Sequence, residues 1–380
     1  MNSLASPHQQ LHGLDHLRSL AIVLVFFFHY QLSFFGHPDW VPTVSKFGWT
    51  GVDLFFVLSG FLISSQLFDQ AKSGKRISWE SYGVKRFFRI VPVYLVVVAA
   101  YFFFPVFREK EALPPLWKFL TFTQNLGLNL RDTGTFSHAW SLCVEAHFYL
   151  LIPLFIGLIT YAKSFNKAYW LIALLFAGGF MIRSYSWTTF YLPVKETSAS
   201  FITWYKYVYY PTYNRLDGLL VGVTIAGISR FLPASWMRIS HSGNRLIGAG
   251  LLLLAGAYFL CEDEQSYAAS VAGFPLIAVG YGLVVAGAIS PSSILFRWHS
   301  RVTSIIARIS YSIYLTHKGM IHVTQFLLGK LTIDTNTNFT LACCIVACVA
   351  AATILTFFVE QPIINMVKNR ASTGQKMRTT

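Results

Sequence analysis

The chain has 380 residues, of which 54% are hydrophobic and 12% are Asp, Glu, Lys or Arg, whereas about 25% are charged in a typical soluble domain. A soluble domain cannot cover its surface with 30 Lys and Arg and 16 Asp and Glu while it also hides 17% aromatic residues. The composition therefore excludes an ordinary cytosolic enzyme, a disordered tail and a fibrous protein. It predicts an all-α, polytopic membrane helical bundle.

Ten segments are long and apolar enough to cross a membrane as helices, which takes about 20 residues each. They are Leu17–Phe35, Gly48–Phe68, Ile90–Phe107, Ala139–Tyr161, Tyr169–Ser186, Tyr207–Ile228, Leu246–Cys261, Ser270–Ile289, Ile305–Leu328 and Phe339–Phe358. The shorter apolar piece Leu116–Leu130 is rich in Thr and Asn, and we interpret it as interfacial or re-entrant. We expect one membrane domain over 1–367 and a polar cytoplasmic tail over 368–380.

The formal net charge of +14 has two readings. In a soluble protein, such a positive charge would indicate nucleic-acid binding. In a membrane protein, the cytoplasmic loops collect Lys and Arg. The second interpretation is favoured, because no long basic run interleaves with a soluble region here. If the N-terminus is cytoplasmic, most Lys and Arg fall on cytoplasmic segments and the acidic loop Glu262–Glu264 falls outside. We therefore expect both termini in the cytoplasm, a location in the cytoplasmic (inner) membrane, and no nucleic-acid partner.

Three ionisable residues of the predicted spans lie at one depth. His29 lies six residues before the outer end of the first span, and Asp53 and Glu145 lie five and six residues after the outer starts of the second and fourth. This places them roughly 8–9 Å below the outer surface at the helical rise per residue. An ionisable residue inside a span is a functional hypothesis by default, and a shared site requires a common depth.

A histidine beside a carboxylate is a general-base arrangement, because the carboxylate selects the tautomer and stabilises the imidazolium as it forms. His29 with Asp53 is therefore a candidate base for a hydroxyl, while Glu145 either orients the acceptor or replaces Asp53 as the partner of the histidine. The structural alternative is that His29 and Asp53 satisfy each other across a helix interface. No residue cluster has metal-ligand spacing, so no metal is predicted.

Arginines on the inner side are suited to a phosphorylated donor. Arg18 precedes His29 by eleven positions, which is about 16 Å along a helix, and Arg86 and Arg89 lie just before the third span. Guanidinium groups suit phosphates, but positive-inside anchoring and lipid head groups explain the same residues, and both interpretations stay open. A cytoplasmic acyl-CoA with its phosphates on these arginines would extend its thioester toward His29.

Six motifs follow one another along almost the whole chain. They are LDHLRSLAIVLVFFFH (Arg18, His29), GWTGVDLFFVLSGFLIS (Asp53, Ser59, Gly60), KRFFRIVPVY (Arg86, Arg89, Pro92, Tyr94), WSLCVEAHFYLLIP (Trp140, Ser141, Glu145, Phe148, Tyr149), NRLDGLLVG (Arg215, Asp217, Gly222) and SYSIYLTH (Tyr311, Tyr314, His317). Together they resemble the bacterial integral-membrane acyltransferases of acyltransferase family three, which move acyl groups, often acetyl, onto hydroxyls of polysaccharides and related acceptors.

The resemblance implies that His29 is the essential catalytic histidine, that Arg18 contacts the donor and that Glu145 is an active-site carboxylate. The other matched side chains are assigned to acyl-CoA binding (Arg86, Arg89) and to substrate binding (Trp140, Tyr149, Arg215, His317). An aromatic belt explains Trp140 equally well. Arg215 needs a carboxylate on another helix or a ligand phosphate as its partner, because Asp217 lies on a different face.

These patterns predict a membrane O-acyltransferase that moves an acyl group, by default acetyl, from cytoplasmic acyl-CoA to an extracytoplasmic glycan or lipid-linked sugar. Attack on the thioester is direct or proceeds through an acyl-His29 intermediate. Many family members continue into an extracytoplasmic hydrolase-like domain, and this sequence ends at 380, so we expect the membrane domain to act alone or with a separate extracytoplasmic partner protein. The alternative is a proton-coupled transporter or flippase, and a non-catalytic scaffold is a third reading.

Overall fold

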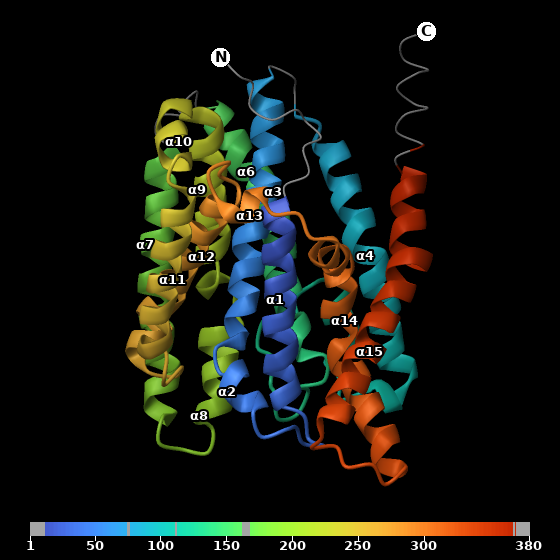
Figure 1. Ribbon diagram of the computed structural model, residues 1–380. Coiled ribbons are helices and arrows are strands. Elements are labelled where there is room, and N and C mark those ends of the chain that lie inside the picture. Colours follow the sequence, from blue (N-terminus) through green and yellow to red (C-terminus); the bar gives the residue numbers. More distant parts are fainter. Residues whose placement is uncertain (1–11, 74–76, 111, 162–167, 368, 370–380) are drawn as a thin grey trace. The chain divides into compact units, whose positions relative to one another are not determined.

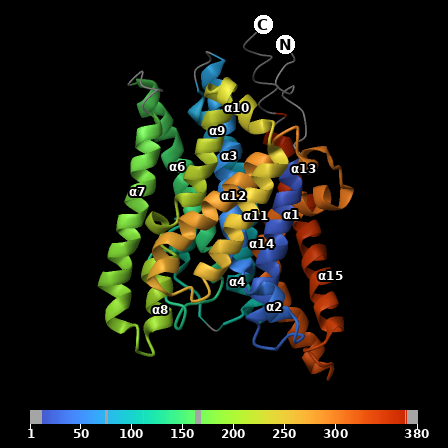
Figure 2. The same ribbon diagram turned by 60° about the vertical axis from the view of Figure 1, so that its left-hand side comes forward.

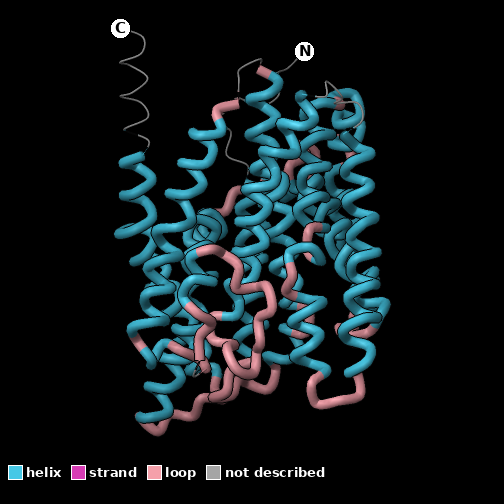
Figure 3. Tube along the Cα trace, turned by 180° about the vertical axis from the view of Figure 1, so that it is seen from behind, coloured by secondary structure: helices cyan, strands magenta, loops and turns pink. Residues whose placement is uncertain are grey.

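The computed structural model describes residues 12–73, 77–110, 112–161, 168–367 and 369, and these residues form helices and loops without a strand (Figure 3). They divide into two compact units. Unit 1 consists of described residues within 1–23, 50–73 and 154–308, and unit 2 of those within 24–49, 74–153 and 309–380. The predicted tail 368–380 lies outside the described residues except for Asn369, and the predicted domain boundary stays a prediction.

Each of the ten predicted spans overlaps a long helix in the described residues. The helices are α1 (His12–Gln31), α3 (Gly51–Lys72), α4 (Trp79–Phe103), α6 (Trp140–Tyr161), α7 (Ala168–Ser186), α9 (Asp217–Phe231), α11 (Gly243–Leu260), α12 (Phe274–Ala288), α14 (Arg301–Lys330) and α15 (Asn338–Leu355). Some of their starts are capped. The side chain of Ser78 accepts from the backbone N–H of Ser81 before α4, and Thr337 accepts from Thr340 before α15, so both hydroxyls satisfy an otherwise unpaired donor.

Shorter elements connect the long helices. They are the α-helices α2 (Val41–Ser45), α5 (Leu116–Leu120), α8 (Ser200–Trp204), α10 (Pro233–Ser240) and α13 (Ile294–Arg297), the 3-10 turns η1 (Gly48–Thr50), η2 (Pro105–Phe107), η3 (Ser137–Ala139), η6 (Leu192–Val194) and η8 (Thr212–Asn214), and the π turns η5 (Trp187–Tyr191), η7 (Tyr205–Tyr209), η9 (Ala269–Gly273) and η10 (Thr356–Glu360). Within the predicted interfacial segment 116–130, only α5 is helical, so this segment is not a full span.

Fewer helices are long and apolar enough to span a membrane than the sequence predicts. Seven helices among the described residues qualify on both counts, and α9 with α10 forms an eighth if that pair, bent by 110°, is one span. The helices α1 and α14 are not among them, and both carry charged residues. The protein is therefore a multi-pass membrane protein, while the count of ten and the cytoplasmic position of both termini are not confirmed.

The sixth predicted span is wrong in its first half. The sequence predicts a continuous helix over Tyr207–Ile228, but η7 and η8 precede α9, which begins only at Asp217. Pro211 lies at the break, and proline both lacks a donor N–H and disfavours the helical conformation of the residue before it. Arg215 therefore lies in the connection before α9, and not in the middle of a helix.

In unit 1, α3 packs along α9, and α11 packs along α12 (Figures 1 and 2). Glycines allow the α3–α9 contact. A Cβ atom at Gly60 would overlap the carbonyl of Leu219, and one at Gly222 would lie 2.5 Å from the backbone nitrogen of Phe61. Gly60 and Gly222 therefore allow the backbones of α3 and α9 to approach closely, as small residues do between membrane helices.

Substitution of Gly222 by alanine is expected to destabilise unit 1 by about 1–3 kcal/mol, because the added methyl group must force two backbones apart. Gly256 on α11 is the matched control, since a Cβ there meets nothing within 4 Å, and Gly256→Ala should be neutral or slightly stabilising. Denaturant titration of both variants in mixed micelles measures the difference. Equal free energies of unfolding for the two variants would contradict the close contact.

In unit 2, the second half of α1 packs with α14 and α15. Their shared core contains Phe26, Tyr30, Ile321, Cys344 and Cys348. The two cysteines are buried and free, as expected for small apolar filler. A loop region over 104–139 completes this unit and contacts α14, where the ring of Phe107 leaves no room for a Cβ at position 319. This loop brings further polar residues to the same part of α14.

Candidate active site

Two histidines from α1 and α14 are hydrogen-bonded in unit 2. The Nδ1 atom of His29 lies 3.0 Å from Nε2 of His317 and 3.0 Å from the carbonyl oxygen of Val25. The Nδ1 atom of His317 lies 2.8 Å from the carbonyl oxygen of Tyr314. His317 is fully buried and His29 is half-buried. One end of this histidine pair is therefore accessible, and it is the imidazole of His29.

The hydrogen bonds determine which ring nitrogens carry protons. A carbonyl oxygen only accepts, so Nδ1 of His317 donates to Tyr314, and the Nε2 of neutral His317 is an acceptor. The Nδ1–H of His29 then donates to His317 and to Val25. Nε2 of His29 is left as an acceptor with a free lone pair, which is the protonation state that a general base requires.

A third histidine completes the cluster. The ring centroid of His138 lies 4.8 Å from that of His317 and 5.7 Å from that of His29. Its Nε2 lies 3.4 Å from the carbonyl oxygen of Leu315, and Tyr314 Oη donates to the His138 carbonyl over 2.7 Å. These contacts hold the buried ring of His138 against His317. In this cluster, the half-buried imidazole of His29 therefore lies beside the two buried imidazoles of His317 and His138.

An ion pair lies beside the histidines. Lys318 Nζ is 2.9 Å from Glu109 Oε1, and both side chains are largely buried. The same ammonium donates to Ser137 Oγ over 3.3 Å, and Glu109 also accepts from the backbone N–H of Phe136. In the adjoining loop, burial lowers the pKa of Lys110, the nearby Lys318 lowers it further, and Glu109 acts in the opposite direction. Glu109 thus compensates the charge of Lys318 next to His317.

Glu145 belongs to a second group of side chains in unit 2. Tyr149 Oη donates to Glu145 Oε2 over 2.7 Å, one helical turn apart on α6. The guanidinium of Arg86 on α4 interacts electrostatically with Tyr149 and Glu145 and lies over the ring of Tyr82 at 6.0 Å. The motif of α4 that contains Arg86 and the motif of α6 that contains Glu145 therefore lie close together. Sequence spacing alone does not predict this proximity of α4 and α6.

Asp53 is engaged by an arginine in unit 1. Arg215 Nη2 donates to both carboxylate oxygens of Asp53, at 2.8 and 3.0 Å, and the guanidinium lies 4.0 Å from the ring centroid of Phe274. Both charged side chains are almost fully buried. The structure thus supplies the carboxylate on another helix that the sequence required for Arg215. This geometry favours a structural role for the pair, and the predicted contact of Asp53 with His29 stays a prediction.

A second buried ion pair lies next to the first. Arg183 Nη1 is 2.6 Å from Asp217 Oδ2 and also donates to the carbonyl oxygen of Asn214 over 3.0 Å. Arg183 is fully buried within α7. The two pairs together bury two positive and two negative charges, so neither charge type is left in excess.

The remaining predicted residues are placed as follows. Trp140 is buried at the start of α6, Arg89 is exposed on α4, and Arg18 is half-buried on α1 in unit 1. Their substrate and donor roles stay predictions. Among the described residues, no group of three or more His, Cys, Asp or Glu side chains could hold a metal ion.

The sequence by itself does not identify His138 and Glu109 as site residues, and it does not predict that His317 contacts His29. His138 lies one position before a predicted span and Glu109 lies in a loop, so neither was counted among the intramembrane ionisable residues. His317 was found, but not as the partner of His29. Lys318, the next residue in the sequence, is the signal that points to further partners, because a lysine in an apolar span needs a carboxylate or a route to water.

The apolar helices and the histidine cluster define a multi-pass membrane protein with a site suited to acid/base chemistry. Residues 11–357 match the family described as Acyltransferase domain. This match covers most of the chain, and the chain belongs to that acyltransferase family. The resemblance to acyltransferase family three inferred from the motifs is thereby confirmed.

Curated relatives are similar over most of this chain. The O-acetyltransferase OatA of Staphylococcus aureus is 25% identical over 84% of this chain and 52% of the relative. The peptidoglycan O-acetyltransferase OatA of Listeria monocytogenes is 28% identical over 92% of this chain and 55% of the relative. The chain thus spans about half the length of these relatives. No solved structure gives a significant match.

Proposed function

We propose that this protein is a membrane O-acyltransferase that moves an acyl group, by default acetyl, from acyl-CoA to a hydroxyl of an extracytoplasmic glycan or lipid-linked sugar. Family membership and the printed activity of the relatives, one of them a peptidoglycan O-acetyltransferase, support the class of reaction. The observation that carries the proposal is the hydrogen-bonded pair of His29 and His317, which leaves Nε2 of His29 as a half-buried acceptor.

In the proposed reaction, Nε2 of His29 accepts the proton of the acceptor hydroxyl. The hydroxyl oxygen attacks the thioester carbonyl carbon, the C–S bond breaks, and the CoA thiolate takes the proton from Nε2, so that ester and CoA thiol are the products. The imidazolium that forms in between keeps its Nδ1–H on the acceptor nitrogen of His317, which holds the ring in one orientation. His317 is therefore a positioning residue in this proposal.

The arginines are proposed as contacts for the phosphates of acyl-CoA. Arg86 and Arg89 lie on one helix three positions apart, a spacing that puts both guanidinium groups on one side of it. Arg86 also interacts with Tyr149 and Glu145. Glu145, Tyr149 and Trp140 are proposed to orient the acceptor, and Arg18 to contact the donor from the cytoplasmic side of the inner membrane.

Purified full-length protein in liposomes tests the function directly. The probes are acetyl-CoA with a ¹³C-labelled acetyl group and, as acceptors, soluble peptidoglycan strands and a lipid-linked disaccharide. We expect CoA release that depends on an acceptor, with the label found as an ester on the glycan by mass spectrometry. Acceptor flux into the liposomes without any acetyl-CoA dependence would support a transporter instead and overturn the proposal. Incubation without acceptor distinguishes direct attack from an acetyl-His29 intermediate.

Replacement of His317 tests its positioning role. His317→Leu removes the acceptor for Nδ1–H of His29 and is expected to lower kcat about 100-fold with little change in the KM for acetyl-CoA. His317→Gln offers a side-chain oxygen as acceptor and should recover part of that loss. His322→Leu, on the same helix and half-buried, is the control and should retain activity. If the Gln and Leu variants at 317 lose activity equally, the hydrogen bond is not what matters there.

A further inference from the structure

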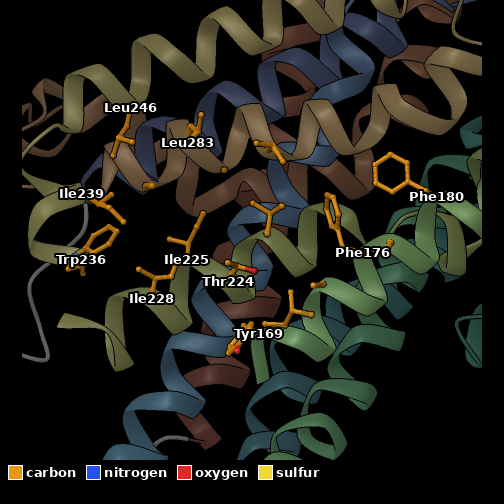
Figure 4. Close-up of a pocket in the computed structure, with 17 residues that line it drawn as sticks. Tyr169, Phe176, Phe180, Thr224, Ile225, Ile228, Trp236, Ile239, Leu246 and Leu283 are labelled. Carbon is orange, nitrogen blue, oxygen red and sulfur yellow. The ribbon is translucent and has the colours of Figure 1, made fainter. Parts of the chain in front are cut away.

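Unit 1 contains a large apolar cavity, one end of which lies next to the buried pair of Arg183 and Asp217. Its volume is about 830 Å³, within the range of about 300–1,000 Å³ that is typical of ligand pockets. Side chains of α7, α9, α10, α11 and α12 line it, and Figure 4 shows Trp236 and Ile239 at one end and Phe180 at the other. At the Phe180 end, the Arg183 guanidinium lies 5.3 Å from the Phe180 ring centroid, so the ion pair with Asp217 closes that end.

The cavity is suited to a hydrocarbon chain. Its walls are built almost entirely from aliphatic and aromatic side chains, and the hydroxyl of Thr224 is already donated to the carbonyl oxygen of Leu220 on its own helix. Apart from the Tyr169 hydroxyl and the Trp236 ring N–H, a polar ligand would find no partner along these walls, and water would not be held between the aliphatic side chains. The lining from Tyr169 to Phe180 on α7 extends about 16 Å along the helix, which is roughly half of a bilayer's hydrocarbon thickness. That is the depth to which a lipid chain of one leaflet reaches.

The end near α10 has the features of a membrane interface. The α10 helix is bent by 110° from α9, and its eight residues are too few to cross a membrane. It presents Trp236 and Ile239 to the cavity and exposes Arg238, a composition typical of an interfacial helix.

The charge around this end is positive. Arg238 and Arg245 are exposed, and no Asp or Glu occurs from Leu232 to Arg245. Neither arginine forms an ion pair in the described part of the chain, whereas the neighbouring Arg230 is paired with Asp69 at 2.7 Å. Two uncompensated guanidinium groups at the end of an apolar cavity suit a phosphate group.

We infer that this cavity binds an anionic phospholipid, with one hydrocarbon chain between α7, α9 and α12 and the phosphate on Arg238 and Arg245. The binding site lies within unit 1 and does not involve His29. The lipid occupies the space that would otherwise be an apolar void, and it ties the interfacial helix α10 to α7. A zwitterionic lipid such as phosphatidylcholine also fills the cavity, but its choline ammonium offsets the attraction of its phosphate to the two arginines. The proposal therefore predicts selectivity for an anionic head group.

Native mass spectrometry tests the inference on full-length protein released from nanodiscs that contain equal phosphatidylglycerol and phosphatidylcholine. We expect one phosphatidylglycerol retained per chain, in clear excess over phosphatidylcholine. Arg238→Gln and Arg245→Gln should each reduce that excess about fivefold. Lys195→Gln, at the opposite end of the helical segment that begins at Tyr169, is the matched charge control and should leave it unchanged.

Filling the cavity tests where the hydrocarbon chain of the lipid binds. Ala177→Trp places an indole in it, and displacement of two lipid methylenes should reduce retention about tenfold. Leu174→Trp puts the same indole on the exposed outer side of α7 and should retain the lipid. Equal retention of the two lipids by the wild type would mean a groove filled by bulk lipid only. That result, or equal effects of the two Trp variants, would overturn the inference.

Discussion

Replacement of His29 by alanine is expected to lower acyl transfer by about 10²–10⁴-fold, the usual contribution of a positioned general base. Nε2 of His29 is the accessible acceptor of the histidine pair, and the two buried rings of His317 and His138 do not replace it. The CoA-release assay in liposomes measures the loss. His322→Ala is the control, because this histidine lies on α14 outside the cluster and its ring packs at a tilt against that of Phe35, with 5.3 Å between the ring centroids.

Added imidazole distinguishes a lost base from a damaged fold. In the His29→Ala variant, free imidazole can enter the space vacated by the ring and should restore activity in proportion to its concentration. The same addition should not affect the wild type or the His322→Ala variant. Undiminished transfer by His29→Ala without imidazole would remove His29 from the mechanism altogether.

The largest expected effect on stability comes from the buried pair of Asp53 and Arg215. Removing one partner, as in Asp53→Leu, leaves an uncompensated buried guanidinium and should cost about 3–5 kcal/mol of unfolding free energy. The double variant Asp53→Leu with Arg215→Met removes both charges and should recover most of that loss, because apolar residues of similar size often replace a buried pair without cost. Denaturant titration in mixed micelles compares the three proteins.

The double variant also decides the role of Asp53. If the carboxylate only stabilises unit 1, the double variant should fold and should transfer acyl groups at a rate close to that of the wild type. If Asp53 orients His29 or Arg215 binds substrate, as the sequence predicts, the double variant should be stable but slow, and an increased KM for the acceptor would indicate the loss of Arg215. A double variant that is no more stable than Asp53→Leu would contradict the interpretation of the two residues as a mutually compensating pair.

Much of the fold could be predicted because its main signal is local. The long apolar segments produce the long helices, and the close-packing role of Gly60 and Gly222 follows from two small residues on apolar helices. The error in the sixth span arose from hydropathy alone, since the aromatic residues Tyr207–Tyr210 are apolar enough to extend a span, whereas Pro211 ends it. The span count is likewise ambiguous for α1 and α14, whose charged residues lower their hydropathy.

The sequence predicts which residues belong to the site better than it predicts which of them contact one another. Scarce charge within apolar helices made His29, Asp53 and Glu145 conspicuous, because each must be functional or paired. Which side chain meets which depends on how helices distant in sequence pack. Thus Asp53 binds Arg215 and His29 binds His317, although a carboxylate was expected beside that histidine. A neutral imidazole is an adequate partner there, because it accepts the Nδ1 proton without burying another charge.

The sequence by itself determined that the protein lies in a membrane, which helices it forms, and which few ionisable residues are available for chemistry, because these follow from composition and local hydropathy. Only the tertiary structure decided that His317 holds His29, that Glu109 compensates Lys318, and that two arginines in unit 1 are buried on two aspartates. These hydrogen bonds and ion pairs act over a few ångströms between residues that lie 34 to 288 positions apart, and that proximity is set by packing rather than by sequence spacing.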